Sequence, residues 1–560
     1  MPVDVPLGPA LRQLRARGFS RVHISPKVHS FEGSLPCAKG KVPVRLDVRD
    51  WDFLTYPTIQ LLDLPAFLPK VLPHVSADGV LCLFAESSVV LDRYRPELAV
   101  AQCLDKATWL LDQIVDNPDF YEAEFHGEFL VHWANADGPR AFGGLVGEHS
   151  KRVTAMQWYD VGSAEEHRLF VSAELDEVTR FCKAAGWPAP TKIPIAGALF
   201  SSDRYPASPA HGLPKNLSEA FAWLKAWDRR VYDQVQDHLL DRKLIKDRCR
   251  ELLFGSPAGW FGLGFELDRK VAGGFQRGRA YRQYLHAHAK DIAVERRSFQ
   301  EAGSTHVHQR NLMRLDAKSL AGKMVVLVGC GAIGGFLAAG LARLGAGTTG
   351  GVLRCYDGGQ LEPDNLGRHW LGYESLFRNK ALAVAERAKA QFPFSRVEGV
   401  AQHLVPSALP KADLIINATG EAAFAEAFNA HHVDRARKTP VLHLWVAGNG
   451  EAAQGLWVDA SRGGCYRCLK KVEAGQAFGT PRFPLLKDEP VRAFVGCHAF
   501  TPYSTTMPTV AAALACDFVM DWLGGEVSPR FRTRVHEHAQ VFKVKNQDIE
   551  RLNGCPACAP

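Results

Sequence analysis

Residues 324–368 read MVVLVGCGAIGGFLAAGLARLGAGTTGGVLRCYDGGQLEPDNLGR, and this stretch decides the fold of the C-terminal half. The apolar run Met324–Val328 predicts one buried strand. Gly329, Gly331 and Gly334 follow with G-x-G-x-x-G spacing, and residues 336–344 have the apolar periodicity of a helix. Strand, glycine turn and helix in this order predict a nucleotide-binding unit, for which NAD or FAD is the default ligand of the glycine motif alone.

The three glycines have separate expected roles. Gly329 permits the sharp turn, Gly331 lets the backbone approach a phosphate, and Gly334 allows close packing of helix and strand. The helix N-terminus then presents unpaired N–H groups and a partial positive charge to the phosphates.

Polar residues beyond the glycine motif favour ATP over NAD. Asp357 closes the next apolar run, where a doubly wound fold holds a ribose. Asn365, Arg368 and Lys380 follow. Attack on the α-phosphate of ATP increases charge on phosphate oxygens, which Arg and Lys stabilise, whereas hydride transfer does not require such cations. Either cation alone could be a solvated surface charge, but the set at this spacing indicates a nucleotide site.

These residues resemble the adenylation domain of ubiquitin-activating (E1) enzymes and their bacterial ThiF/MoeB relatives, over about residues 305–560. The resemblance implies an α/β domain with a doubly wound, mostly parallel sheet, and the alternating apolar runs and helical patterns of residues 300–560 agree with it. It implies ATP and Mg²⁺ as cofactors and a homodimer formed through the adenylation domain. E1 relatives place an Arg upstream of the first strand that reaches the partner subunit's ATP, and Arg310 and Arg314 are the candidates here.

The magnesium position departs from the family. E1 enzymes have an N-A-x-D segment after the fourth strand, whereas this chain has Gly420 at the aspartate position. Glu421, one residue later, is the candidate ligand because magnesium prefers carboxylate oxygen.

Two C-x-x-C pairs, Cys465 with Cys468 and Cys555 with Cys558, predict a zinc site. Four thiolates can close a tetrahedral site around Zn²⁺. No export signal is visible at the N-terminus, so the thirteen cysteines indicate a reducing cytoplasm, where zinc is favoured over disulfides. A thioredoxin-type redox motif is the alternative for either pair. Zinc-clamped E1 relatives carry the two pairs in this order.

An adenylated carboxylate is a mixed anhydride that a thiolate can attack, so an E1-type site requires a nucleophilic cysteine. In E1 enzymes it lies after the first zinc pair and before a helix, and Cys497 occupies that region. A cysteine close to a helix N-terminus can have a lowered pKa. A structural loop cysteine is the alternative for Cys497, and Cys516 is expected in a helix core.

Residues 1–125 contain a second candidate cysteine. The segment from His74 through Val80-Leu81-Cys82-Leu83, with Pro96 opening a helix, resembles the catalytic region of ubiquitin-conjugating (E2) enzymes, and the resemblance implies an α+β domain. The His-Pro-Asn motif of that family is absent. His74 stands where the family has its asparagine, and we expect it to donate a hydrogen bond to the oxyanion. A buried strand cysteine is the alternative for Cys82.

Residues 126–300 are expected to form a linker domain. The segments EFLVHWA, MQWYDVG and RLFVSAEL predict strands, and 219–251 predicts charged helix. The basic stretch 276–315 is interpreted as a solvated helix face and not as a nucleic-acid contact, because no aromatic stacking pattern accompanies it.

An E2-like unit before an E1-like unit resembles the E2–E1 fusion proteins of bacterial CBASS antiphage operons. The resemblance implies that ATP activates a protein with a glycine-type C-terminal tail, which for CBASS is the CD-NTase, and that the acyl group passes through Cys497 and Cys82 to a target amine. Three alternatives stay open: conjugation of a bacterial ubiquitin-like protein, sulfur transfer of the ThiF/MoeB kind, and a non-catalytic nucleotide-binding scaffold. The excess of 67 basic over 60 acidic residues is too small to require nucleic acid, and no membrane partner is expected.

Overall fold

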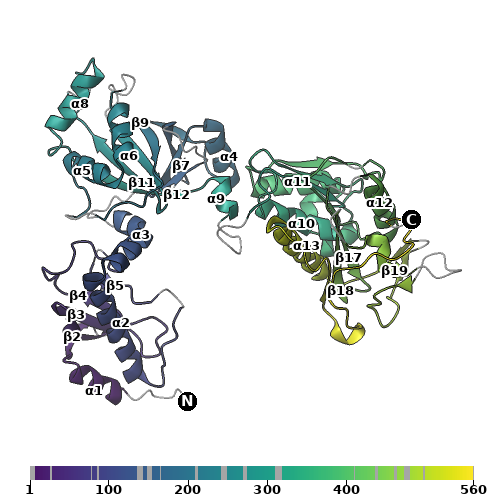
Figure 1. Ribbon diagram of the computed structural model, residues 1–560, viewed down its shortest axis with the longest axis horizontal. Coiled ribbons are helices and arrows are strands. Elements are labelled where there is room, and N and C mark those ends of the chain that lie inside the picture. The colour runs from purple at the N-terminus through teal and green to yellow at the C-terminus, as the bar shows by residue number, and fades with distance from the viewer. Residues whose placement is uncertain are drawn as a thin grey trace. The chain divides into compact units, whose positions relative to one another are not determined.

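The computed structural model describes two compact units, residues 1–178 with 188–301 and residues 179–187 with 302–560 (Figure 1). The described residues are 7–25, 28–76, 78–84, 88–134, 143–147, 154–163, 166–208, 212–240, 249–268, 271, 274–309, 318–408, 410–435, 439–459, 463–471, 480–495 and 498–558.

The first unit begins with an antiparallel sheet packed against two helices. Its five strands pair in chain order, and α1 and α2 share one apolar core with them. In β3 every second residue is buried, which is the pattern of a sheet with one face on the core. The elements are α1 (Gly8–Ala16), β1 (Ser20–Ser25), β2 (Val28–Cys37), β3 (Gly40–Val48), β4 (Thr58–Leu61), β5 (Val80–Leu81) and α2 (Pro96–Asp116).

The strand predicted at EFLVHWA is wrong, because these residues end helix α3 (Pro118–Ala134). Phe125, Phe129 and Trp133 recur every fourth residue and are fully buried in the core of the following domain. The indole N–H of Trp133 donates to the carbonyl of Gly262, 3.1 Å away. A short apolar run suits a strand or a buried helix equally, and here burial against the barrel decides for the helix.

A closed seven-stranded barrel follows α3 in the same unit. Strands β7 and β8 confirm two of the predicted strands, whereas residues 249–251, predicted as helix, begin β10. The order around the barrel is β10-β11-β12-β6-β8-β7-β9. The strands are β6 (Gly143–Val146), β7 (Thr154–Gly162), β8 (His167–Ser172), β9 (Thr191–Ser201), β10 (Cys249–Ser256), β11 (Gly259–Glu266) and β12 (Glu295–Glu301), and the helices of this part are α5 (Leu217–Trp227), α6 (Arg229–His238) and α8 (Gly278–Ala287). Helix α9 (Ser304–Gln309) and most of α4 (Leu175–Ala185) belong to the second unit.

The second unit is built on a seven-stranded sheet with the order β15-β14-β13-β16-β17-β18-β23. The first five strands are parallel, and β18 and β23 are antiparallel to their neighbours. The strand order reverses between β13 and β16, which is where doubly wound sheets bind ligands. The strands are β13 (Met324–Val328), β14 (Val352–Tyr356), β15 (Val397–Val400), β16 (Leu414–Asn417), β17 (Val441–Ala447), β18 (Ala452–Val458) and β23 (Phe531–Val535).

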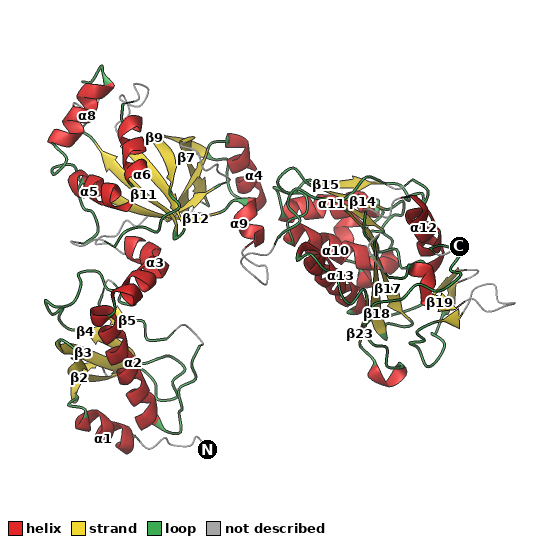
Figure 2. Ribbon diagram, viewed as in Figure 1, coloured by secondary structure: helices red, strands yellow, loops and turns green. Residues whose placement is uncertain are grey.

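Helices cover both faces of this sheet (Figure 2). In β13, Val325 and Leu327 pack with α10, α11 and α13, whereas Val326 and Val328 pack with Phe428 of α12 on the other face. The expected doubly wound sheet is therefore confirmed. The helices are α10 (Ala332–Arg343), α11 (Lys380–Gln391), α12 (Ala422–Arg435) and α13 (Met507–Leu523).

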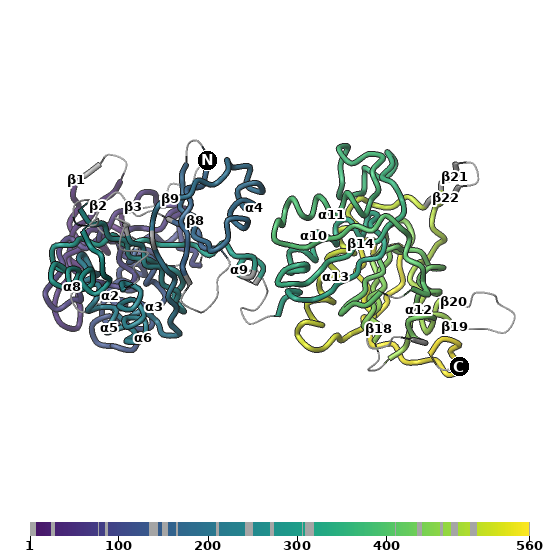
Figure 3. The backbone as a smooth tube through the Cα atoms, turned by 90° about the horizontal axis from the view of Figure 1, so that it is seen from above, coloured from purple at the N-terminus to yellow at the C-terminus, as the bar shows by residue number. Residues whose placement is uncertain are grey.

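Two short hairpins complete the second unit, β19 (Lys470–Lys471) with β20 (Thr480–Pro481) and β21 (Ala493–Val495) with β22 (His498–Phe500) (Figure 3). Across both units, none of the described helices combines the length and apolar composition that crossing a bilayer requires.

Candidate functional site

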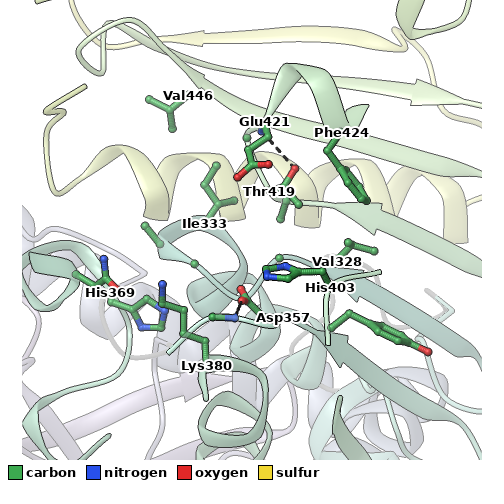
Figure 4. A pocket seen from close by; sticks show the side chains of 18 of the residues that line it. Val328, Ile333, Asp357, His369, Lys380, His403, Thr419, Glu421, Phe424 and Val446 are labelled. Atoms are coloured by element: carbon green, nitrogen blue, oxygen red, sulfur yellow. Dashed lines mark hydrogen bonds between the residues drawn. The ribbon is translucent and has the colours of Figure 1, made fainter. Parts of the chain in front are cut away.

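A cavity of about 530 Å³ lies where the strand order reverses, at the carboxyl ends of β13, β14 and β16. It brings together most of the residues that the sequence singled out for the nucleotide, although they come from separate loops (Figure 4). Those lining it are Gly329, Gly331, Asp357, Asn365, Arg368, Lys380 and Glu421.

The glycine loop is shaped by close backbone contacts. Gly329 has a φ of +88°, and a Cβ there would lie 2.9 Å from the backbone nitrogen of Thr419. A Cβ on Gly334 would lie 1.8 Å from the carbonyl oxygen of Gly329, which no side chain tolerates. Helix α10 therefore begins tightly against β13, with its N-cap Gly331 on the cavity wall. It starts at Ala332, four residues before the predicted start.

Asp357 is held at the cavity by its own loop. One carboxylate oxygen accepts the backbone N–H of Cys330 and the other that of Gly359, each at 2.8 Å. A carboxylate oxygen can accept more than one hydrogen bond, so Asp357 retains capacity for the hydroxyls of a ribose.

Two cations, Arg368 and Lys380, lie on the same cavity. Lys380 is the first residue of α11 behind the N-cap Asn379, whose side chain accepts from the N–H of Leu382. The guanidinium of Arg368 lies over the ring of Tyr503, 4.9 Å from its centre. The geometry can therefore place two positive charges beside a bound triphosphate.

Sequence reasoning missed several residues on the cavity wall, among them His369, His403 and Tyr503. His369 Nε2 lies 2.7 Å from the carbonyl oxygen of Cys330, and Nδ1 accepts the N–H of Leu371. Burial lowers the pKa of His369, so the ring is neutral and donates from Nε2. Its position directly after Arg368 was the one signal that could have identified it.

Glu421 lines the cavity beside Gly420. Its backbone N–H donates to the hydroxyl of Thr419 at 3.3 Å, and that hydroxyl donates to Asn417 at 2.8 Å. Figure 4 shows the Glu421 carboxylate on the opposite wall of the cavity from Lys380. A carboxylate so placed has the donor type that magnesium requires, and Gly420 offers none.

The four predicted metal ligands, Cys465, Cys468, Cys555 and Cys558, meet at one point although the pairs are far apart in sequence. All are buried, and their sulfur atoms lie within 4.8 Å of one another. The sulfur of Cys465 is 3.9 Å from those of Cys468 and Cys555, and Cys468 is 3.5 Å from Cys558. Zinc–sulfur bonds of about 2.3 Å place tetrahedral sulfur atoms about 3.8 Å apart, so this cluster fits zinc.

Three predicted site residues, Arg310, Arg314 and Cys497, lie outside the described residues. The described strands β21 and β22 flank Cys497 in the chain. Cys516, expected in a helix core, lies in α13, where burial raises the pKa of its thiol to about 11.

Cys82 is exposed and directly follows Leu81, the last residue of the edge strand β5. Its N–H donates to the carbonyl oxygen of His74 at 2.7 Å. Partial burial, then the negative charge of Glu128, raises the pKa of the Cys82 thiol. The exposed position suits acyl transfer, whereas the raised pKa means that the resting form is the neutral thiol.

His74 is held by two carboxylates of α3. Nε2 lies 2.7 Å from Glu124 and Nδ1 lies 2.8 Å from Glu128, and the His74 backbone N–H also donates to Glu128. Hydrogen bonding to Glu128 is the main cause that raises the pKa of His74. Burial opposes ionisation of Glu128, but hydrogen bonds from His132 and His74 outweigh it and lower that pKa. Because both ring nitrogens face carboxylates, His74 in this arrangement has no free N–H for an oxyanion.

Comparison with known proteins finds matches to two families, in the order in which the sequence predicts an E2-like unit before an E1-like unit. Residues 15–141 match Prokaryotic E2 family B, and residues 305–557 match the ThiF family. The chain is 28% identical over 510 residues to the ATP-dependent ubiquitin transferase-like protein Cap2 of Pseudomonas aeruginosa, covering 91% of this chain and 90% of the relative. A protein of the same name from Escherichia coli is 24% identical over 564 residues, covering 93% and 91%.

Among solved structures, E. coli MccB with ATP is 20% identical with a TM-score of 0.33. That match covers 42% of this chain and 66% of the MccB chain.

Proposed function

We propose that this chain, an E1/E2-like enzyme carrying a prokaryotic E2 family B domain ahead of a ThiF-family domain, activates the C-terminus of another protein and ligates it to an amine. The observation that carries the proposal is the cavity at the sheet's switch point, where a glycine loop, a carboxylate and two cations converge. The activated protein has a glycine-type tail, and the CBASS resemblance makes the CD-NTase the first candidate.

In the first step, a carboxylate oxygen of the tail attacks the α-phosphorus of ATP and pyrophosphate leaves. Arg368 and Lys380 stabilise the charge that grows on the phosphate oxygens, and Asp357 orients the ribose. Glu421 would hold Mg²⁺, which when bound neutralises phosphate charge. Arg310 and Arg314 are proposed to reach the ATP of a partner subunit in a homodimer.

The acyl group then moves between sulfur atoms. The thiolate of Cys497 attacks the acyl-adenylate carbonyl and AMP leaves; the thiolate of Cys82 attacks that thioester and frees Cys497. The amine of a target protein attacks the Cys82 thioester, an amide forms, and the thiol is released. The contacts of both His74 ring nitrogens with Glu124 and Glu128 support a role in positioning Cys82, in place of donating a hydrogen bond to the oxyanion. Zinc held by the four cysteines would tie the C-terminal segment to the middle of the ThiF-family domain.

We also propose that residues 1–125, 126–300 and 301–560 act as the E2-like, linker and adenylation domains. The reaction requires free thiols and is therefore assigned to the reducing cytoplasm.

The test incubates the full chain with ATP, Mg²⁺ and a CD-NTase from the same genome as the candidate substrate, and follows ATP–pyrophosphate exchange and thiol-sensitive adducts on non-reducing gels. We expect adducts on Cys497 and Cys82 and a conjugate that survives reduction. Cys82→Ala should stop conjugation while the Cys497 adduct accumulates, and Cys37→Ala, a half-buried cysteine of the same domain, should behave as wild type. Unchanged conjugation by Cys82→Ala would show the E2 assignment to be wrong, and a persulfide or thiocarboxylate product would indicate sulfur transfer instead.

A further inference from the structure

The hairpin that flanks Cys497 is fastened at its base by one side chain. Asn449, in the turn between β17 and β18, donates from Nδ2 to the carbonyl oxygens of Val491 and Pro502, at 2.9 and 2.7 Å. Its Oδ1 accepts the N–H of Val491 at 2.7 Å. Val491 precedes β21 and Pro502 follows β22, so a single amide joins both ends of the hairpin to the sheet.

The neighbouring residue brings the same turn against the outgoing end of the hairpin. Gly450 has a φ of +96°, and a Cβ there would lie 3.0 Å from the backbone nitrogen of Ser504 and 3.3 Å from Cβ of Tyr503. The turn at residues 449–450 therefore sets the path of the chain on both sides of the hairpin.

The base of the hairpin also forms part of the nucleotide cavity. Tyr503, next to Pro502, lines that cavity, and burial raises the pKa of its hydroxyl. The guanidinium of Arg368 lies over the Tyr503 ring. The outgoing end of the hairpin therefore borders the cavity where the acyl-adenylate would form, and Asn449 joins the incoming end, at Val491, to the outgoing end at Pro502.

We propose that Asn449 is a positioning residue for thioester formation, which holds the base of the Cys497 hairpin at the nucleotide cavity. The inference rests on the proposed function, since it assumes that Cys497 is the acceptor. In the step concerned, a bond forms between Sγ of Cys497 and the acyl carbon, the bond from that carbon to the AMP oxygen breaks, and the thiol proton passes to solvent.

An asparagine suits this task because it uses both amide protons as donors and its oxygen as an acceptor. Aspartate would keep the acceptor and lose both donors, and alanine would lose all three contacts. Misplacing a reacting group by about 1 Å can cost about 10²-fold in rate. The proposal therefore predicts that loss of the contacts slows the sulfur attack far more than the preceding adenylation.

The experiment compares Asn449→Ala and Asn449→Asp with wild type in the full chain, with the CD-NTase as substrate. ATP–pyrophosphate exchange and hydroxylamine trapping of the acyl-adenylate report the first step, and a single-turnover gel assay reports the Cys497 thioester. We expect both first-step readouts to stay near wild type, and the thioester rate to fall at least about tenfold in Asn449→Ala and less in Asn449→Asp. Arg492→Ala, an exposed change beside Val491, is the matched control and should leave all three readouts unchanged.

A wild-type thioester rate in Asn449→Ala would overturn the inference. Parallel loss of exchange and thioester would also overturn it, because the residue would then support the fold of the whole cavity. If Cys497→Ala still forms the first adduct, the proposed function is wrong at that cysteine, whichever result the Asn449 variants give.

Discussion

Replacing Glu128 by glutamine should release the turn that positions Cys82. His74 in that turn has a φ of +61°, a left-handed conformation that is costly for a residue with a side chain. Glu128 accepts from both the ring and the backbone of His74, and the carbonyl of His74 accepts from Cys82. The carboxylate therefore stabilises a strained residue that contacts the cysteine directly.

The size of the effect follows from these contacts. The side chains of His74 and Glu128 are 23% and 25% exposed, so solvent screens the pair only in part. Hydrogen bonds to ionised groups contribute about 1.5–3 kcal/mol each. Glutamine keeps one acceptor oxygen and loses the charge, so we expect a loss of about 2 kcal/mol. This loss is similar to the cost of about 1–3 kcal/mol for a strained backbone residue and corresponds to about a 30-fold shift toward the released turn.

The effect should depend on pH in a defined way. The pKa of His74 is raised, so its contribution to stability is complete below its ordinary value of 6.5 and is lost as pH rises through the folded value. The pKa of Glu128 is lowered, so its contribution is complete above 4.5 and is lost as pH falls through the folded value. The difference in stability of this turn between wild type and Glu128→Gln is therefore greatest between pH 4.5 and 6.5, and it declines as the pH rises above or falls below that window.

Native-state hydrogen exchange of peptides covering residues 74–84 measures the release of this turn directly, because the Cys82 N–H donates a hydrogen bond to the carbonyl oxygen of His74. We expect protection there to fall by about 30-fold within that pH window in Glu128→Gln. Glu122→Gln is the control, since Glu122 lies on the same helix but faces His126. Unchanged protection in Glu128→Gln, or an equal fall in Glu122→Gln, would refute the reasoning.

Three further predictions concern residues 305–557, the part of the chain that matches the ThiF family. Lys380→Ala should lower ATP–pyrophosphate exchange by about 10²–10³-fold, the usual effect of removing one charge-stabilising donor, and equal exchange in wild type and variant would contradict this. Cys558→Ala should remove bound zinc, measured by elemental analysis, and lower the melting temperature, because one of four ligands is lost; full zinc content would exclude the cluster as the metal site. Gly334→Ala should abolish ATP binding in calorimetry, because its Cβ would overlap the carbonyl of Gly329, whereas Gly367→Ala, where a Cβ meets nothing within 4 Å, should keep binding.

The nucleotide loop was predictable because its signals are local. An apolar run of five residues specified β13, and the spacing of its glycines follows from the contact between Gly334 and Gly329. The four cysteines were predictable for a similar reason, since each C-x-x-C turn aims two sulfur atoms at one point. The predicted start of α10 lies four residues after the observed one, because Gly334 and Gly335 are poor helix formers and yet lie inside this helix.

Other features depend on which surfaces meet. The sequence predicts a strand at EFLVHWA because the apolar residues of this short segment show no clear helical or strand periodicity. The two faces of helix α3 are distinguished only by what each contacts in the folded chain. Phe129 enters the barrel core while Glu128, the residue before it, reaches His74. The His74 contact could not be predicted, because Glu128 lies 54 residues away in the chain.

The sequence by itself determined the nucleotide loop, the doubly wound sheet and the cluster of Cys465, Cys468, Cys555 and Cys558, because each is encoded by spacing within short segments. The tertiary structure alone decided that Glu128 holds His74, that Asn449 joins both ends of the Cys497 hairpin and that Tyr503 borders the nucleotide cavity. These contacts form between segments with no periodic relation, so they exist only once the sheet order and the packing of the helices bring the segments together.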